Sequence, residues 1–126
     1  MQDHHFSPRL HESTAPFSHF VKHGDTGYTA GIIGQRADDG SLVSEDVKTQ
    51  CEAMMENLGT LLSDLHLEFS NILRTTIYLV DYADFELINS VYGSYFEKPF
   101  PVRTTVQVAA LPLGAKVQID TVLALP

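Results

Sequence analysis

The most chemically informative part of this sequence is a strand-like segment near the C-terminus that contains one arginine, Arg103. Side chains of the two parities differ, with Val102, Thr104, Val106 and Val108 on one and Arg103, Thr105 and Gln107 on the other. This alternation predicts a β-strand with one core face and one polar face. A guanidinium on a partly shielded strand needs an anion, and its planar fork matches a carboxylate. Arg103 therefore predicts either a carboxylate-binding site or a structural ion pair with an Asp or Glu across a subunit interface.

A second alternating segment covers residues 117–125 and follows a loop that contains proline and glycine. Two such segments favour a β-hairpin. If the strands pair, Gln118 and Asp120 share the polar side with Arg103. A glutamine can hydrogen-bond a water molecule but cannot accept its proton. Asp120 is either a substitute base or an exposed carboxylate near the end of the strand.

Alternating segments elsewhere predict the remaining strands. A short first strand is expected at 16–21, a second at 28–33 and a third at 72–80. Turn residues rich in glycine and aspartate separate the first two. Together with the C-terminal pair, these strands form one mixed sheet.

Two helices are expected between the strands. Ser44 is the predicted N-cap of the first, whose apolar residues recur at spacings of three and four. The stripe consists of Val47, Cys51, Met54, Met55, Leu58, Leu61, Leu62 and Leu65. The second helix begins near Phe85 and ends before Pro99, because proline cannot continue a helix. The predicted order is ββαβαββ, an α+β fold with both helices on one face of the sheet.

Composition limits the classes of function. The chain has 126 residues, enough for one domain at 15–126, preceded by a polar, flexible arm at 1–14. Eight basic and sixteen acidic residues give a net charge of −8, which opposes binding to nucleic acid or to anionic membranes. No apolar stretch is long enough to span a membrane, and no secretory signal is visible. A cytoplasmic protein is expected.

The N-terminal histidines and the single cysteine could suggest a metal site and a nucleophile, but neither function is expected. Five histidines lie within the first 23 residues, but no acidic or cysteine ligand pattern accompanies them, so no metal site is expected. Cys51, the one cysteine, lies within the apolar helix stripe and is expected to be a small buried thiol rather than a nucleophile.

One sheet face remains without a cover. Two helices can shield only one side of the sheet, while residues such as Thr76, Tyr78 and Val122 do not form a fully charged opposite surface. Self-association is therefore expected.

The C-terminal run PVRTTVQVAALPLGAKVQID resembles the signature of the Rid/YjgF family, the reactive intermediate deaminases, which are also described as endoribonucleases or translation inhibitors. Further similarities lie upstream, at Ala30-Gly31, the segment 39–43, Gln50, Asn57-Leu58, the segment 75–81, Asp84-Phe85, Asn89 and Tyr92. The resemblance covers roughly residues 15 to 125. It implies a homotrimer of chorismate-mutase-like chains with ligand clefts between subunits. No cofactor is expected.

The resemblance also implies roles for individual residues. Arg103 matches the family arginine that binds the substrate carboxylate, assisted by backbone groups at Gly31 and Thr105. Gln118 matches a glutamate that holds the catalytic water in the best-known branch. Phe17 stands where that branch has a tyrosine, and Ala30 where it has a serine. These differences affect the hydrolytic half of the site more than the carboxylate-binding half.

Three functions follow, in order of preference. The first is a deaminase that hydrolyses imines or enamines of 2-oxo acids, or of a larger unsaturated amino acid, to a carbonyl compound and ammonia. The second is a non-catalytic binder of small 2-oxo or amino carboxylates. The third is a ribonuclease or translation inhibitor, which the acidic charge makes least favoured.

Overall fold

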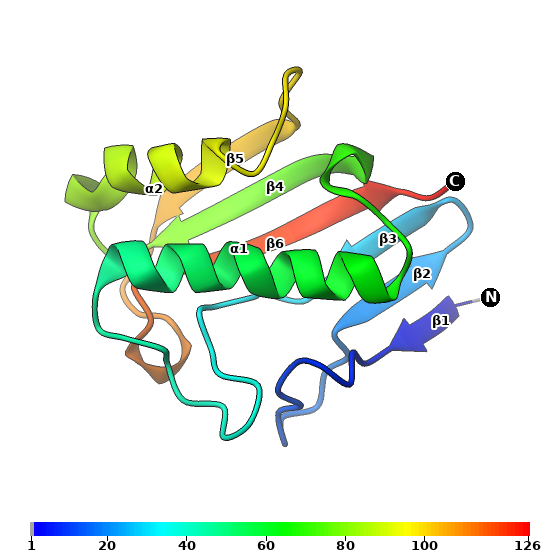
Figure 1. Ribbon diagram of the computed structural model, residues 1–126, viewed down its shortest axis with the longest axis horizontal. Coiled ribbons are helices and arrows are strands. Elements are labelled where there is room, and N and C mark those ends of the chain that lie inside the picture. The colour runs from blue at the N-terminus through cyan, green and yellow to red at the C-terminus, as the bar shows by residue number, and fades with distance from the viewer. Residues whose placement is uncertain (1) are drawn as a thin grey trace.

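The computed structural model describes residues 2–126, and it consists of a mixed six-stranded sheet with two helices packed on one face (Figure 1). The strands are β1 (Gln2–His5), β2 (Phe20–His23), β3 (Thr26–Thr29), β4 (Ile72–Leu79), β5 (Val102–Gln107) and β6 (Val117–Ala124). The helices are α1 (Val47–Asp64) and α2 (Phe85–Gly93). The strand order across the sheet is β1-β2-β3-β6-β4-β5. The predicted α+β class is confirmed, with one strand, β1, added before the predicted order.

Helix α1 forms where the apolar stripe predicts it, but its N-cap is two residues later than expected. The Asp46 carboxylate accepts a hydrogen bond from the Thr49 backbone N–H, which satisfies one of the unpaired donors of the first turn. Ser44 instead accepts a hydrogen bond from the Asp46 N–H with its hydroxyl oxygen. Both residues are good caps, and the sequence pattern alone does not decide between them.

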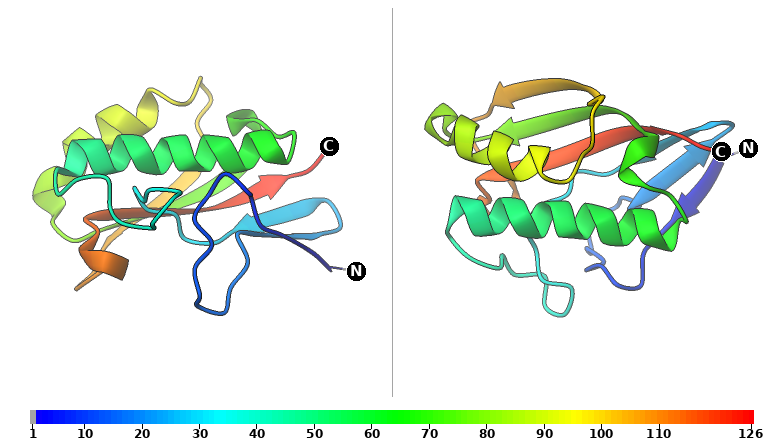
Figure 2. Two further views of the ribbon diagram at one scale, coloured as in Figure 1. Left: turned by 60° about the horizontal axis from the view of Figure 1, so that its bottom comes forward. Right: turned by 45° about the horizontal axis from the view of Figure 1, so that its top comes forward.

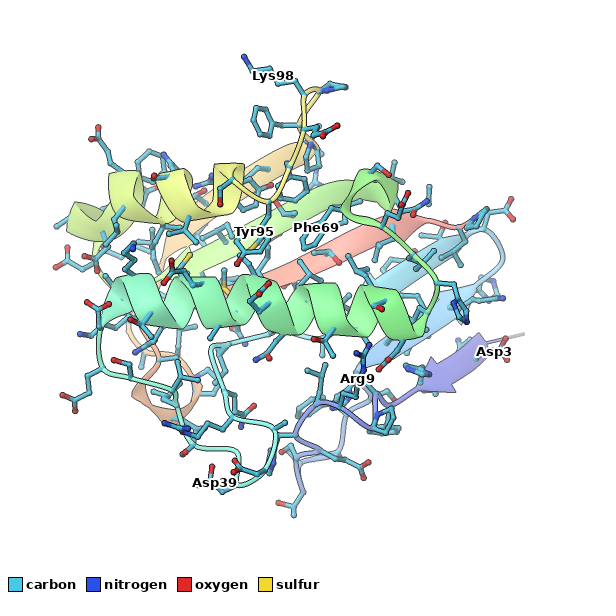
Figure 3. All side chains as sticks on the ribbon, in the orientation of Figure 1. Asp3, Arg9, Asp39, Phe69, Tyr95 and Lys98 are labelled. Carbon is cyan, nitrogen blue, oxygen red and sulfur yellow. The ribbon has the colours of Figure 1, made fainter. Side chains whose placement is uncertain are left out.

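The core lies between the two helices and one face of the sheet. Helix α1 contributes Cys51, Met54, Met55, Leu58, Leu61 and Leu62, and the strands contribute Ile77, Leu79, Val117, Ile119 and Leu123. Burying a large aliphatic side chain stabilises by roughly 1.5 to 3 kcal/mol, so α1 is a principal source of stability. Figure 3 shows Phe69 and Tyr95 side by side at the edge of this core, with ring centroids 5.8 Å apart.

The opposite face of the sheet has no helical cover in the described chain (Figure 2). Apolar side chains on this face are exposed, including Val102 at 61%, Tyr28 at 48% and Val106 at 37%. The valines of β5 were expected on the core face from their parity. They lie on the open face instead, because Arg103 and Thr105 face α2.

The N-terminal strands are shifted from their predicted positions. Strands β2 and β3 are joined by a two-residue loop, since His23 pairs with Thr26, and Gly24 has a φ of 60°. Strand β1 lies within the segment 1–14, for which a loose arm was expected, and pairs antiparallel with β2. Its side chains are mostly exposed. An edge strand of this kind is held by backbone hydrogen bonds, so its polar sequence shows no apolar alternation.

The predicted C-terminal hairpin is wrong. Strand β5 pairs in parallel with β4, and β6 pairs antiparallel with the other edge of β4, so β4 lies between them. Arg103 is opposite Thr75, whereas Gln118 is opposite Tyr78. Thr75 and Tyr78 are three residues apart on one strand and therefore face opposite sides. Arg103 and Gln118 thus lie on opposite faces of the sheet within one chain.

Candidate functional site

Arg103 lies in a pocket under α2 that fixes its guanidinium from several directions. Its Nε donates to the Thr105 hydroxyl at 2.8 Å, and one terminal nitrogen donates to the Asn89 side-chain oxygen at 2.6 Å. The guanidinium carbon is 4.8 Å from the Tyr92 ring centroid and 5.5 Å from that of Phe85. Cation–π contacts of this kind stabilise a guanidinium over an aromatic face. The side chain is therefore held in one orientation.

No carboxylate pairs with Arg103 anywhere in residues 2–126. Burial lowers the pKa of Arg103 from its usual value, and the nearby Tyr92 opposes that effect. An arginine nevertheless stays cationic at neutral pH. A cavity of about 220 Å³ beside it is lined by Asn89, Tyr92, Gly93, Phe100, Pro101 and Arg103. The positive charge is thus available to an anion from outside the chain.

Tyr92 connects this pocket to the core. Its hydroxyl is 2.8 Å from the hydroxyl of Thr75, which is fully buried on β4. Burial raises the pKa of Tyr92, so the phenol is neutral at physiological pH. The ring below the guanidinium is therefore anchored to the central strand of the sheet.

Gln118 lines a second, larger cavity of about 710 Å³ together with Gly31 and Phe17. A Cβ atom at position 31 would lie 2.3 Å from the Gln118 side-chain nitrogen, so only glycine leaves room for this amide. Within the described residues, the Gln118 side chain forms no hydrogen bond, which leaves it available to a water molecule or ligand. Phe17 is 47% exposed at the same cavity.

Asp120, the alternative base, is already engaged. The Tyr78 hydroxyl donates to its Oδ2 at 2.6 Å. This hydrogen bond is the main cause of the raised pKa of Tyr78. The carboxylate belongs to a tyrosine–aspartate pair on the open face, next to Gln118 along β6.

The structure groups the five predicted site residues into two sets. Arg103 and Thr105 lie together under α2, and Phe17, Gly31 and Gln118 lie together at the larger cavity. Sequence reasoning did not assign roles to Asn89 or His11, which line the first and second cavities respectively. The spacing of Phe85, Asn89 and Tyr92 by four and three residues places them on one helix face. That spacing was the available signal for Asn89, whereas no periodicity marks His11.

Other chemically reactive groups have structural explanations. Burial raises the pKa of the Cys51 thiol to about 12, so it is not a nucleophile at neutral pH. Among residues 2–126, no group of three or more His, Cys, Asp or Glu side chains is arranged to hold a metal ion. Neither described helix has the length and apolar character needed to cross a bilayer.

Comparison with known proteins identifies relatives over most of the chain. The profile of the family described as endoribonuclease L-PSP matches residues 8–125. Reactive Intermediate Deaminase A of Arabidopsis thaliana chloroplasts is 39% identical over 110 residues, which are 87% of this chain but only 59% of that protein. The human 2-iminobutanoate/2-iminopropanoate deaminase is 37% identical over 107 residues, covering 85% of this chain and 78% of that protein.

Solved structures of related proteins have the same fold as this chain. RidA from an Antarctic Psychrobacter species superposes with a TM-score of 0.88 at 30% identity, over 94% of this chain and 95% of that one. The resemblance to the Rid/YjgF proteins seen in the C-terminal run is confirmed by these matches. Because the profile spans nearly the whole length, this chain belongs to the endoribonuclease L-PSP family, in which its Rid relatives are found.

Proposed function

We propose that this protein is a deaminase that hydrolyses reactive imines or enamines of 2-oxo acids to the carbonyl compound and ammonia. The observation that supports this most strongly is Arg103, a half-buried guanidinium oriented by Thr105 and Asn89 with no carboxylate partner in the described chain. A substrate carboxylate supplies the missing anion. The names of the human and Arabidopsis relatives point to the same class of reaction.

The site is completed between chains of a homotrimer. Within one chain, Arg103 and Gln118 lie on opposite faces of the sheet, so no single cleft contains both. A neighbouring chain packed on the uncovered face and around the edge strand β5 brings its own Gln118 cavity toward the Arg103 pocket and buries the exposed valines of β5. Light scattering should give a mass of three times the 14.0 kDa chain. A stable monomer at micromolar concentration would contradict this assembly.

The hydrolysis of an imine needs few catalytic groups from the protein. In a protonated imine the carbon is already electrophilic, so holding the carboxylate and orienting one water supplies much of the acceleration. Arg103 holds the carboxylate, with Thr105 fixing the guanidinium and Gly31 leaving room for Gln118. Gln118 orients the water through its amide, and Phe17 forms an apolar wall that influences which side chain fits.

The direct test uses 2-iminobutyrate generated in the assay by an amino-acid oxidase and trapped by semicarbazide. An active deaminase diverts the imine to 2-oxobutyrate and ammonia, which lowers the yield of semicarbazone. If the purified trimer binds 2-oxobutyrate but leaves the trapping rate unchanged with several imines, the protein is a binder of small carboxylates instead. The lack of a base at Gln118 would suit a binder, but we favour this second function less than the first because the names of the relatives indicate a deaminase.

The remaining alternative, a ribonuclease or translation inhibitor, is disfavoured by the net charge of −8. We further propose a cytoplasmic location, because the one cysteine is a buried free thiol. Fractionation with antibodies against the protein tests this directly.

A further inference from the structure

The segment that precedes β2 is fixed to the rest of the molecule through His19, which is 8% exposed. The Ser7 backbone N–H donates to His19 Nδ1 at 2.9 Å, and His19 Nε2 is 3.1 Å from the His11 carbonyl oxygen. Since Nδ1 accepts, Nε2 carries the proton and donates to that carbonyl. One buried imidazole thereby holds two points of the N-terminal segment, four residues apart.

The same segment is tied to the C-terminal end of α1. The Ser7 hydroxyl donates to the Asp64 carboxylate, and Arg9 Nε donates to its other oxygen at 2.8 Å. Figure 3 shows Arg9 between the end of α1 and the N-terminal strands. Leu10 packs against the hydrophobic core. These contacts place the residue that follows, His11, at a defined position.

The His11 ring itself lies against Gly40. A Cβ atom at position 40 would lie 2.5 Å from His11 Nε2 and 2.7 Å from two ring carbons. Gly40 also has a φ of 77°, which independently favours glycine. The carbonyl of Gly40 accepts a hydrogen bond from Gln35, which fixes this turn. The position of the His11 backbone is therefore fixed by the contacts of the N-terminal segment, and the Nε2 edge of its ring packs against Gly40.

His11 lines the 710 Å³ cavity that also contains Gln118 and Gly31. Neither of its ring nitrogens has a hydrogen-bond partner among residues 2–126. Two other titratable side chains line the same cavity, Glu12 and Asp39. Glu12 is exposed, and hydrogen bonds from Ser41 to Oδ1 of Asp39 lower the pKa of that carboxyl. His19 faces His11 only through the backbone carbonyl.

We propose that His11 is the proton-transfer residue of this cavity and supplies the acid–base function that Gln118 lacks; this inference rests on the proposed deaminase activity. The neutral imidazole accepts a proton from the attacking water as its oxygen bonds to the imine carbon and the C=N π electrons move to nitrogen. The resulting imidazolium returns the proton to the amino nitrogen of the carbinolamine. The C–N bond then breaks with its electron pair going to nitrogen, the neutral imidazole takes the hydroxyl proton and passes it to solvent, and the products are the 2-oxo acid and ammonia.

The test compares His11→Gln with the wild type in the semicarbazide-trapping assay from pH 5.5 to 8.5, each point corrected by a reaction without the protein. His23→Gln is the matched control, since His23 is exposed on β2 and lines neither cavity. Light scattering and circular dichroism establish that each variant keeps its assembly and fold. General acid–base catalysis commonly contributes a factor of roughly 10² to 10⁴.

We expect His11→Gln to lower kcat at least tenfold with KM nearly unchanged. The wild type and His23→Gln should lose activity on the acid side, where an imidazole becomes protonated, and His11→Gln should not show that limb. A His11→Gln enzyme with wild-type kcat and an unchanged pH profile, or with only KM raised, would overturn the assignment while leaving the deaminase function intact. A wild type inactive on every imine would instead refute the deaminase function, and this inference with it.

Discussion

The two cavities differ in how firmly their key side chain is held. Arg103 has two hydrogen bonds and two aromatic neighbours, all from β5 and α2. Gln118 has no hydrogen bond within the described chain and is limited mainly by the glycine next to it. A binding group that must recognise one fixed anion benefits from pre-organisation, because its side-chain conformational entropy is lost on folding rather than on binding. Gln118, the residue proposed to orient water, is left adjustable.

The largest effect on carboxylate binding is expected at Arg103. Arg103→Ala should weaken binding of 2-oxobutyrate by about 2 to 5 kcal/mol, because a charged, hydrogen-bonded pair is lost. Isothermal titration calorimetry measures this, with Lys48→Ala on the exposed face of α1 as the control, because Lys48 lines neither cavity. Loss of the trimer in Arg103→Ala, together with a wild type that never binds carboxylates, would make Arg103 an interface residue.

The role of Gln118 is tested by replacing it with a glutamate, which can act as a base. In the His11→Gln background, Gln118→Glu places a carboxylate at the proposed position of the water and should raise the hydrolysis of 2-iminobutyrate by a factor of roughly 10² or more. Only the ionised carboxylate accepts a proton, so this gain should disappear as the pH falls through the pKa of the new glutamate. Gln118→Ala serves as the companion variant. If Gln118→Ala keeps the wild-type rate, the water is held by another group.

The glycine that limits Gln118 provides a smaller effect. Gly31→Ala places a methyl group where the amide of Gln118 now lies, and overpacking of this kind costs roughly 1 to 3 kcal/mol unless the side chain moves away. Thermal unfolding measures the cost, and kcat/KM should fall as Gln118 is displaced. Gly59→Ala on α1 is the matched control, because a Cβ atom there comes no closer than 3.4 Å to its neighbours and Gly59 lines neither cavity. Equal behaviour of the two variants would mean that Gln118 has another rotamer available.

The smallest effect is expected beneath the guanidinium. Tyr92→Phe removes the hydrogen bond to buried Thr75 but keeps the ring below Arg103. The free energy of unfolding in urea should fall by about 0.5 to 1.5 kcal/mol, while affinity for 2-oxobutyrate changes less than twofold. A large loss of affinity would show that the tyrosine hydroxyl, rather than the ring, supports the arginine.

The parts of the fold predicted from the sequence are those that depend on local periodicity. Helices α1 and α2 and strand β4 lie close to their expected positions, because their apolar residues repeat with the period of the element. The hairpin prediction failed because alternation shows that a segment is a strand but not which strand it pairs with. The 108–116 loop passes the end of β4 rather than turning directly back.

The same limitation applies to the candidate site. The resemblance named Arg103, Thr105, Gly31, Phe17 and Gln118, and the structure places them at two cavities. Their separation depends on the register of β4 with both of its neighbours, which no residue pattern records. His11 was assigned to a loose arm, because its position is determined by contacts with His19 and Gly40 that are distant in sequence.

The position of β6 in the sheet has a consequence for the order in which the molecule can be assembled. This strand ends at Ala124, yet it lies between β3 and β4 and pairs with both. During synthesis the N-terminal strands and the β4–α2–β5 unit are therefore complete before the strand that joins them has left the ribosome. The sheet can close only after β6 has been synthesised, and a chain truncated before Val117 would consist of two separate strand groups with exposed inner edges prone to pairing with other chains.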